Sequence, residues 1–101
     1  MAHKPALIVS VSSSSGGAYP VAELRMSSYK NTRICYIPDH VIVRNVEKVF
    51  NTPGLDKSNA DDFRIKTRLI YSLEVLRVYA ESFKSIRKSS SIDLKKYSSG
   101  M

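Results

Sequence analysis

The sequence is poor in cysteine, with Cys35 alone among 101 residues. A single cysteine cannot close an internal disulfide, which excludes a disulfide-stapled secreted scaffold and favours a reducing compartment. One cysteine and two distant histidines, His3 and His40, also match no structural zinc spacing. We therefore expect an intracellular protein, cytoplasmic or nuclear, that holds neither a metal nor a cofactor.

Long apolar runs are also missing. The run Ala6–Val11 is shorter than the core of a signal peptide, and no small-residue cleavage site follows it. Charged residues interrupt the most hydrophobic region at Arg68, Glu74 and Arg77, so no stretch approaches the roughly 18 apolar residues of a membrane-spanning helix. We expect neither a signal peptide nor a transmembrane helix.

The chain lacks a group of residues with catalytic spacing. Cys35, Asp39 and His40 are close in sequence, but neighbouring side chains on a strand point to opposite faces. The loop Ser12–Gly17 follows a predicted strand, yet it lacks the Gly-Lys-Ser/Thr ending of a phosphate-binding loop. We expect a non-enzymatic protein with no small-molecule substrate.

The composition is that of a globular protein, with 43% apolar and 25% charged residues. A chain of this length is large enough for one hydrophobic core and too short for two. We predict a single domain over residues 1–101, with flexible termini at 1–5 and 89–101. A connecting loop is predicted at 51–57.

The first half of the chain alternates apolar and polar residues as half-buried strands do. A flexible Ser13–Gly17 loop favours a hairpin after the first strand, and Pro38 with Asp39 favours a turn farther along. The pattern predicts a small antiparallel sheet within residues 6–46, built from four extended segments, 6–12, 21–27, 33–37 and 41–46.

The second half has neither glycine nor proline between Leu55 and Ser99. Ser58 is a suitable N-cap, acidic residues follow it and basic residues end the segment, which predicts a long amphipathic helix over about 59–88. A strand over Phe63–Tyr71, followed by a helix, remains open because apolar residues also alternate there. A helix-packing seam with one central hydroxyl is formed by Ile65, Leu69, Ser72, Leu76, Tyr79, Phe83 and Ile86.

The chain carries 16 Lys and Arg against 9 Asp and Glu, a net charge of +7, which indicates a polyanionic partner. Basic residues follow one line beside the seam, where they can track phosphates. Some of them are at helical pairing distance from acids: Asp62 with Lys66, Glu74 with Arg77, and Glu81 with Lys84. The predicted nucleic-acid-binding residues are Lys66, Arg77, Lys84, Arg87, Lys88, Lys95 and Lys96.

Apolar residues extend beyond the seam around much of the predicted helix. A helix that is apolar on most sides is usually buried on more than one of them. In a chain this short the second side is expected to meet another subunit. We predict a homodimer or higher oligomer with interface residues Ile70, Tyr71, Val75 and Val78.

Together these features predict an α+β fold in which a small antiparallel sheet packs against a long C-terminal amphipathic helix. The predicted function is oligomeric, sequence-independent binding of nucleic acid, RNA in particular, through phosphate contacts. Two other functions remain open. One is a structural or assembly protein, such as a viral matrix-like or coat-like subunit on an anionic membrane. The other is a small module whose helix docks into a partner protein.

Overall fold

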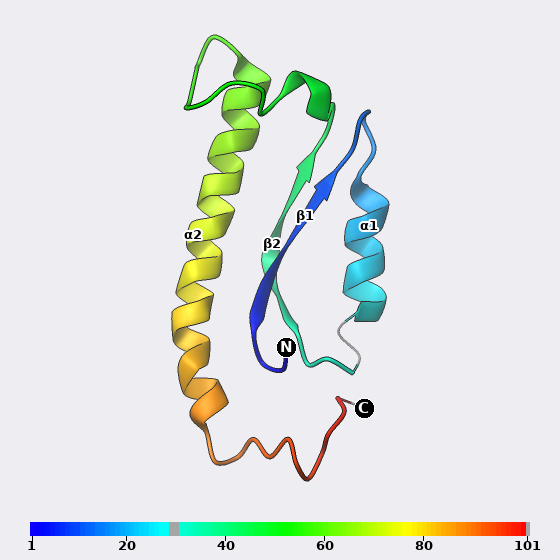
Figure 1. Ribbon diagram of the computed structural model, residues 1–101, viewed down its shortest axis with the longest axis vertical. Helices are drawn as coiled ribbons and strands as arrows, with labels where there is room; N and C mark the ends of the chain where they lie inside the picture. The colour runs from blue at the N-terminus through cyan, green and yellow to red at the C-terminus, as the bar shows by residue number, and fades with distance from the viewer. Residues whose placement is uncertain (29–30, 101) are drawn as a thin grey trace.

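The computed structural model describes residues 1–28 and 31–100, and a two-stranded sheet lies between two helices (Figure 1). The molecule measures 54 × 26 × 17 Å along its principal axes. The elements, in chain order, are β1 (Pro5–Val11), α1 (Ala18–Glu23), the π-helical turn η1 (Leu24–Ser28), β2 (Cys35–Val43), the 3-10 turn η2 (Val46–Lys48) and α2 (Ala60–Lys88).

The sheet is parallel, so the prediction of an antiparallel sheet is wrong. Parallel strands cannot be joined by a tight hairpin and need a crossover segment. Helix α1 with η1 supplies that crossover, in the segment 21–27 that we predicted to be a strand. Pro20 fits the first turn of α1, where its missing N–H has no helical partner to lose. Val21 is buried on the helix, which contacts β1.

The two predicted strands on either side of Pro38 are one continuous strand, β2. Its register with β1 shifts between Ala6 and Ile8, which leaves extra residues on β2 as a bulge. Pro38 lies in this bulge, where a missing N–H removes no ladder hydrogen bond. The Arg25 guanidinium donates from Nη2 to the carbonyls of Ile37 (3.0 Å) and Pro38 (3.1 Å), so η1 supports the bulge directly.

Helix α2 confirms the predicted C-terminal helix, and the Phe63–Tyr71 segment is helical throughout. Its N-cap is Asn59, one residue after the predicted cap, and the Asn59 side-chain oxygen accepts the Asp62 N–H at 3.2 Å. The first part of the predicted seam faces the sheet, because Ile65 and Leu69 pack on a core formed by Val41, Val43 and Val49, whereas Ile86 at its far end is exposed. Ser72, the hydroxyl within the seam, is completely buried.

No helix in the described part of the chain is long and apolar enough to cross a membrane.

Candidate nucleic-acid interface

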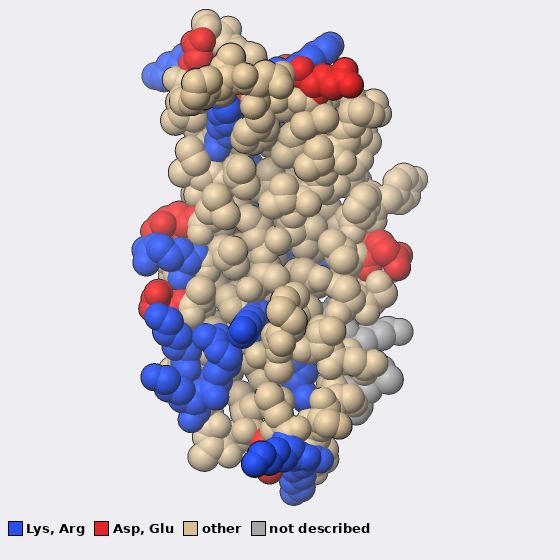
Figure 2. Space-filling view, viewed as in Figure 1, with Lys and Arg blue, Asp and Glu red and all other residues tan. Residues whose placement is uncertain are grey.

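Lysine and arginine side chains gather at one end of the molecule, over the last turns of α2 and the tail that follows it (Figure 2). Between Lys84 and Gly100 the sequence has five basic residues and a single acid, Asp93. The predicted binding residues do not share one environment, however. The structure divides them into a buried lysine, two paired cations and an exposed group.

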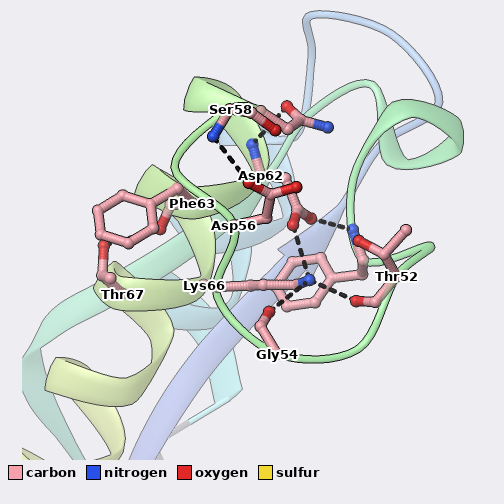
Figure 3. Close-up of polar contacts among 10 residues, drawn as sticks. Thr52, Gly54, Asp56, Ser58, Asp62, Phe63, Lys66 and Thr67 are labelled. Atoms are coloured by element: carbon pink, nitrogen blue, oxygen red, sulfur yellow. Dashed lines mark hydrogen bonds and ion pairs between the residues drawn. The ribbon is translucent and has the colours of Figure 1, made fainter.

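Lys66 is buried, with 8% of its surface exposed, and does not belong to an open stripe. Its ammonium group forms an ion pair with Asp62 Oδ2 at 2.6 Å (Figure 3). It also donates to the carbonyls of Thr52 (2.5 Å) and Gly54 (3.0 Å), so all three N–H bonds are used. The expected phosphate contact by Lys66 is therefore replaced by a structural role inside the protein.

Asp62 is the centre of this buried group and is 1% exposed. One carboxylate oxygen accepts the Phe50 N–H at 2.6 Å, while the other meets Lys66. These hydrogen bonds, with Lys66 first and then Phe50, lower the pKa of Asp62 below its usual value. Asp62 and Lys66 together attach the loop before α2 to the first two turns of the helix (Figure 3).

Arg77 and Lys84 are exposed, but each is paired as the spacing predicted. Arg77 Nη2 lies 2.6 Å from the Glu74 carboxylate, and Lys84 Nζ lies 2.8 Å from that of Glu81. The hydrogen bond from Arg77 lowers the pKa of Glu74, and the bond from Lys84 lowers the pKa of Glu81. Because each pair is locally neutral, these two cations add little to the field that a polyanion meets.

The remaining predicted residues form an exposed group that we call the cationic end: Arg87, Lys88, Lys95 and Lys96. Asp93 does not pair with their side chains, because its Oδ1 accepts the backbone N–H groups of Lys95 (2.9 Å) and Lys96 (3.0 Å). The only acid in this part of the sequence thus stabilises a turn of the tail and leaves the lysine side chains available.

The cationic end is held in place by residues that are distant from it in the sequence. Arg33 donates through Nη2 to the carbonyls of Tyr97 and Ser99. Arg87 Nη1 donates to the His3 carbonyl at 3.1 Å, which joins the end of α2 to the N-terminal segment. The tail therefore folds back toward the sheet. The flexibility predicted for residues 89–101 is a statement about motion, which a single structure does not test, so it stays a prediction. Met101 lies outside the described residues.

A second cationic region was not predicted from the sequence. Two adjoining hollows of about 340 and 250 Å³ lie between α2 and β2, and Asp61 is the one acid among their lining residues. Asp39 compensates part of the charge through an ion pair with Arg68 at 2.9 Å. The four-residue spacing of Arg64 and Arg68 was the available signal in the sequence. We call this region the cationic hollow; its basic residues are Arg44, Lys48, Arg64 and Arg68.

The predicted oligomer residues are not gathered in one patch. Ile70, Tyr71 and Val78 are exposed and Val75 is half-buried. Ile70 lines a hollow with the loop before α2, whereas Tyr71 lies under the Arg68 guanidinium at 5.7 Å on another flank of the helix. Whether any of them contacts a second subunit stays a prediction.

Within residues 1–28 and 31–100, no three His, Cys, Asp or Glu side chains are grouped as metal ligands. The cationic end and the cationic hollow are surfaces of exposed basic side chains, which can make ionic contacts to an anion. Comparison with protein-family models, with curated proteins and with solved structures finds no match to this chain.

Proposed function

We propose that this protein binds single-stranded RNA without catalysis and without sequence preference, through the cationic end. The supporting observation is the accumulation of exposed basic side chains after Lys84 with one acid, Asp93, whose carboxylate is held by backbone N–H groups. Lysine ammonium groups act as point charges toward phosphates and do not read base edges. Such a partner places the protein in the cytoplasm or the nucleus.

An exposed aromatic ring favours a single strand over a duplex. Tyr97 is 64% exposed, and the Lys96 ammonium lies 5.4 Å from its ring centre. Unstacked bases of a single strand can stack on such a ring, while neighbouring lysines contact the backbone. In a duplex the bases are already stacked, so the ring would have no partner.

The test measures fluorescence anisotropy of a labelled uridine RNA of about 20 nucleotides over a range of salt concentrations. With four phosphate contacts, the logarithm of the association constant should fall against the logarithm of salt with a slope of about −3. In the triple variant Lys88→Gln, Lys95→Gln, Lys96→Gln, one predicted contact remains, so the slope should decrease to about −1.

A matched control removes the same number of positive charges elsewhere, in the triple variant Lys48→Gln, Lys57→Gln, Arg64→Gln. All three side chains are exposed. This control should keep a slope close to that of the wild-type chain. If the control loses its salt dependence and the variant in the cationic end keeps it, the RNA is bound at the cationic hollow and the proposal is wrong.

An anionic lipid surface is a second candidate, because apolar side chains accompany the lysines of the tail. Leu94 and Tyr97 are both exposed beside Lys95 and Lys96. Apolar and basic side chains on one short segment favour an interface between lipid headgroups and acyl chains. Sedimentation with phosphatidylserine vesicles distinguishes the two: binding to vesicles without binding to RNA would support the lipid surface and contradict the RNA proposal.

A further inference from the structure

The molecule exposes more surface than a compact protein of its mass. Its accessible surface is 7145 Å², whereas a compact monomer of 11.3 kDa should expose about 5,700 Å². The radius of gyration is 16.7 Å against about 13 Å for a compact chain of this length. The exposed tail contributes to the difference of about 1,400 Å², which exceeds the roughly 800 Å² that each partner buries in a standard interface.

The free edge of β1 is the part of this surface that is least protected against pairing. In the described part of the chain, β1 pairs with β2 alone, so its other edge has no strand partner. Its sequence, PALIVSV, contains no charged residue. The strand β2 carries Pro38, Asp39 and a bulge, which are features that discourage edge pairing. A two-stranded sheet is also a marginal unit by itself.

The side chains of β1 next to this edge are apolar and poorly covered. Val9 and Val11 are register partners of Val41 and Val43, so all four point to the face that α2 covers. Val41 and Val43 are buried beneath the helix, whereas Val9 is 46% exposed and Val11 is 60% exposed. Helix α2 contacts both strands, but it covers Val41 and Val43 of β2 far more completely than Val9 and Val11 of β1.

Helix α2 adds further apolar surface on the same side. One flank of α2 carries Arg64 and Arg68, faces β2 and lines the cationic hollow. On the flank of α2 away from Arg64 and Arg68, Ile70 borders an apolar hollow of about 370 Å³ shared with the loop before α2. Leu73 is exposed two turns along the helix from Lys66, on this same flank. Figure 2 shows a broad area with few charged atoms between α2 and α1.

We propose that a second copy of this chain pairs with β1 about a twofold axis. An axis perpendicular to the strand makes the two β1 strands antiparallel, so each copy offers the same N–H and C=O groups to the other. The result is a four-stranded sheet with the strand order β2, β1, partner β1, partner β2. The pairing buries the exposed valines of β1 and places the two cationic ends at opposite ends of the dimer. It does not depend on RNA binding.

The test is the mass in solution, measured by light scattering after size exclusion from low to high micromolar protein without RNA. The wild-type chain should approach twice 11.3 kDa. Val11→Lys should stay monomeric at the same concentrations, because the twofold axis brings the lysine of each copy into the same apolar interface. Circular dichroism should show unchanged helix content in this variant, since Val11 is 60% exposed in the single chain.

The matched control is Val78→Lys, which introduces the same charge at a 52% exposed valine of α2 away from β1. This control should remain a dimer. Val9→Lys places the same charge at the other exposed valine of β1 and should also be monomeric. This variant replaces Val11→Lys in the test if Val11→Lys loses helix content. A wild-type monomer at high micromolar concentration, or a dimer lost in Val78→Lys and kept in both β1 variants, would overturn the proposal.

Discussion

Ser72 is a buried hydroxyl with no hydrogen-bond partner in the described residues, in the middle of the α2 surface that faces the sheet. A buried polar group without a partner destabilises a fold, and alanine is also the better helix former. We expect Ser72→Ala to raise the free energy of unfolding by about 1 kcal/mol, measured by urea denaturation.

The counterpart of that substitution is Ser72→Leu. Because Ser72 is 0% exposed, a larger side chain has no room and should lower stability. If leucine were tolerated as well as alanine, the packing of α2 against the sheet would differ from that described.

The ionisation of Asp62 makes the stability of the fold depend on pH. Its pKa is lowered in the folded chain by Lys66 and by the Phe50 N–H, so its ionised form stabilises the fold above the ordinary carboxyl pKa of 3.8. As the pH falls through the lowered pKa this contribution is lost. In Asp62→Asn, we expect a melting temperature about 10 °C lower at pH 7 and a smaller decrease on acidification.

Melting curves by circular dichroism between pH 7 and pH 2 check this expectation. Glu74 and Glu81 also have a lowered pKa and remain in both proteins, so the difference between the two profiles isolates Asp62. Parallel pH profiles for Asp62→Asn and the wild-type chain would contradict the assigned role.

At the scale of the element, the bulge of β2 depends on Arg25. Its guanidinium meets the carbonyls of Ile37 and Pro38, which lie where the strand register shifts. Arg25→Met keeps most of the length of the side chain and removes these two hydrogen bonds together with a longer one, of 3.5 Å, to the Asp39 carbonyl. We expect the melting temperature to fall by about 5–10 °C. Arg64→Met, at an exposed arginine of α2, is the control and should change it by no more than a few degrees.

Helix α2 was predictable because its signals are local. The acidic first turn, the basic last turn and the pairs of Glu74 with Arg77 and Glu81 with Lys84 each involve residues close together in the sequence, and the structure contains them. The N-cap was predicted one residue too early, at Ser58, because Ser58 and Asn59 are both suitable caps. The ion pair of Asp62 with Lys66 was predicted as well. Its burial was not, because that depends on carbonyls of a separate loop.

The sheet and the tail were less predictable for a physical reason. A period of two residues identifies a strand but does not tell whether its neighbour runs parallel or antiparallel. The alternation within 21–27 suggested a strand, whereas the crossover between parallel strands requires the helical segment found there. The contacts of Arg33 with Tyr97 and Ser99 join residues more than sixty positions apart, and no spacing rule connects them.

For the whole molecule, the two proposals concern different surfaces. The proposed phosphate contacts involve the cationic end, and the proposed pairing involves the free edge of β1. In such a dimer the two proposed nucleic-acid sites lie at opposite ends. An RNA molecule long enough to reach both sites should bind more tightly than a short one, because binding at one site raises the effective concentration of RNA at the other. Variants of β1 should remove that length dependence and leave the binding of short RNA unchanged.

The parallel order of the sheet also determines when its parts can form during folding. Helix α2 needs only neighbours along the chain, and helices form in about a microsecond. The pairing of β1 with β2 joins residues about thirty positions apart, such as Pro5 with Cys35, and must wait until the crossover has closed. During that delay the uncharged strand β1 is open along both of its edges, so the chain is exposed to misassembly until this pairing has formed.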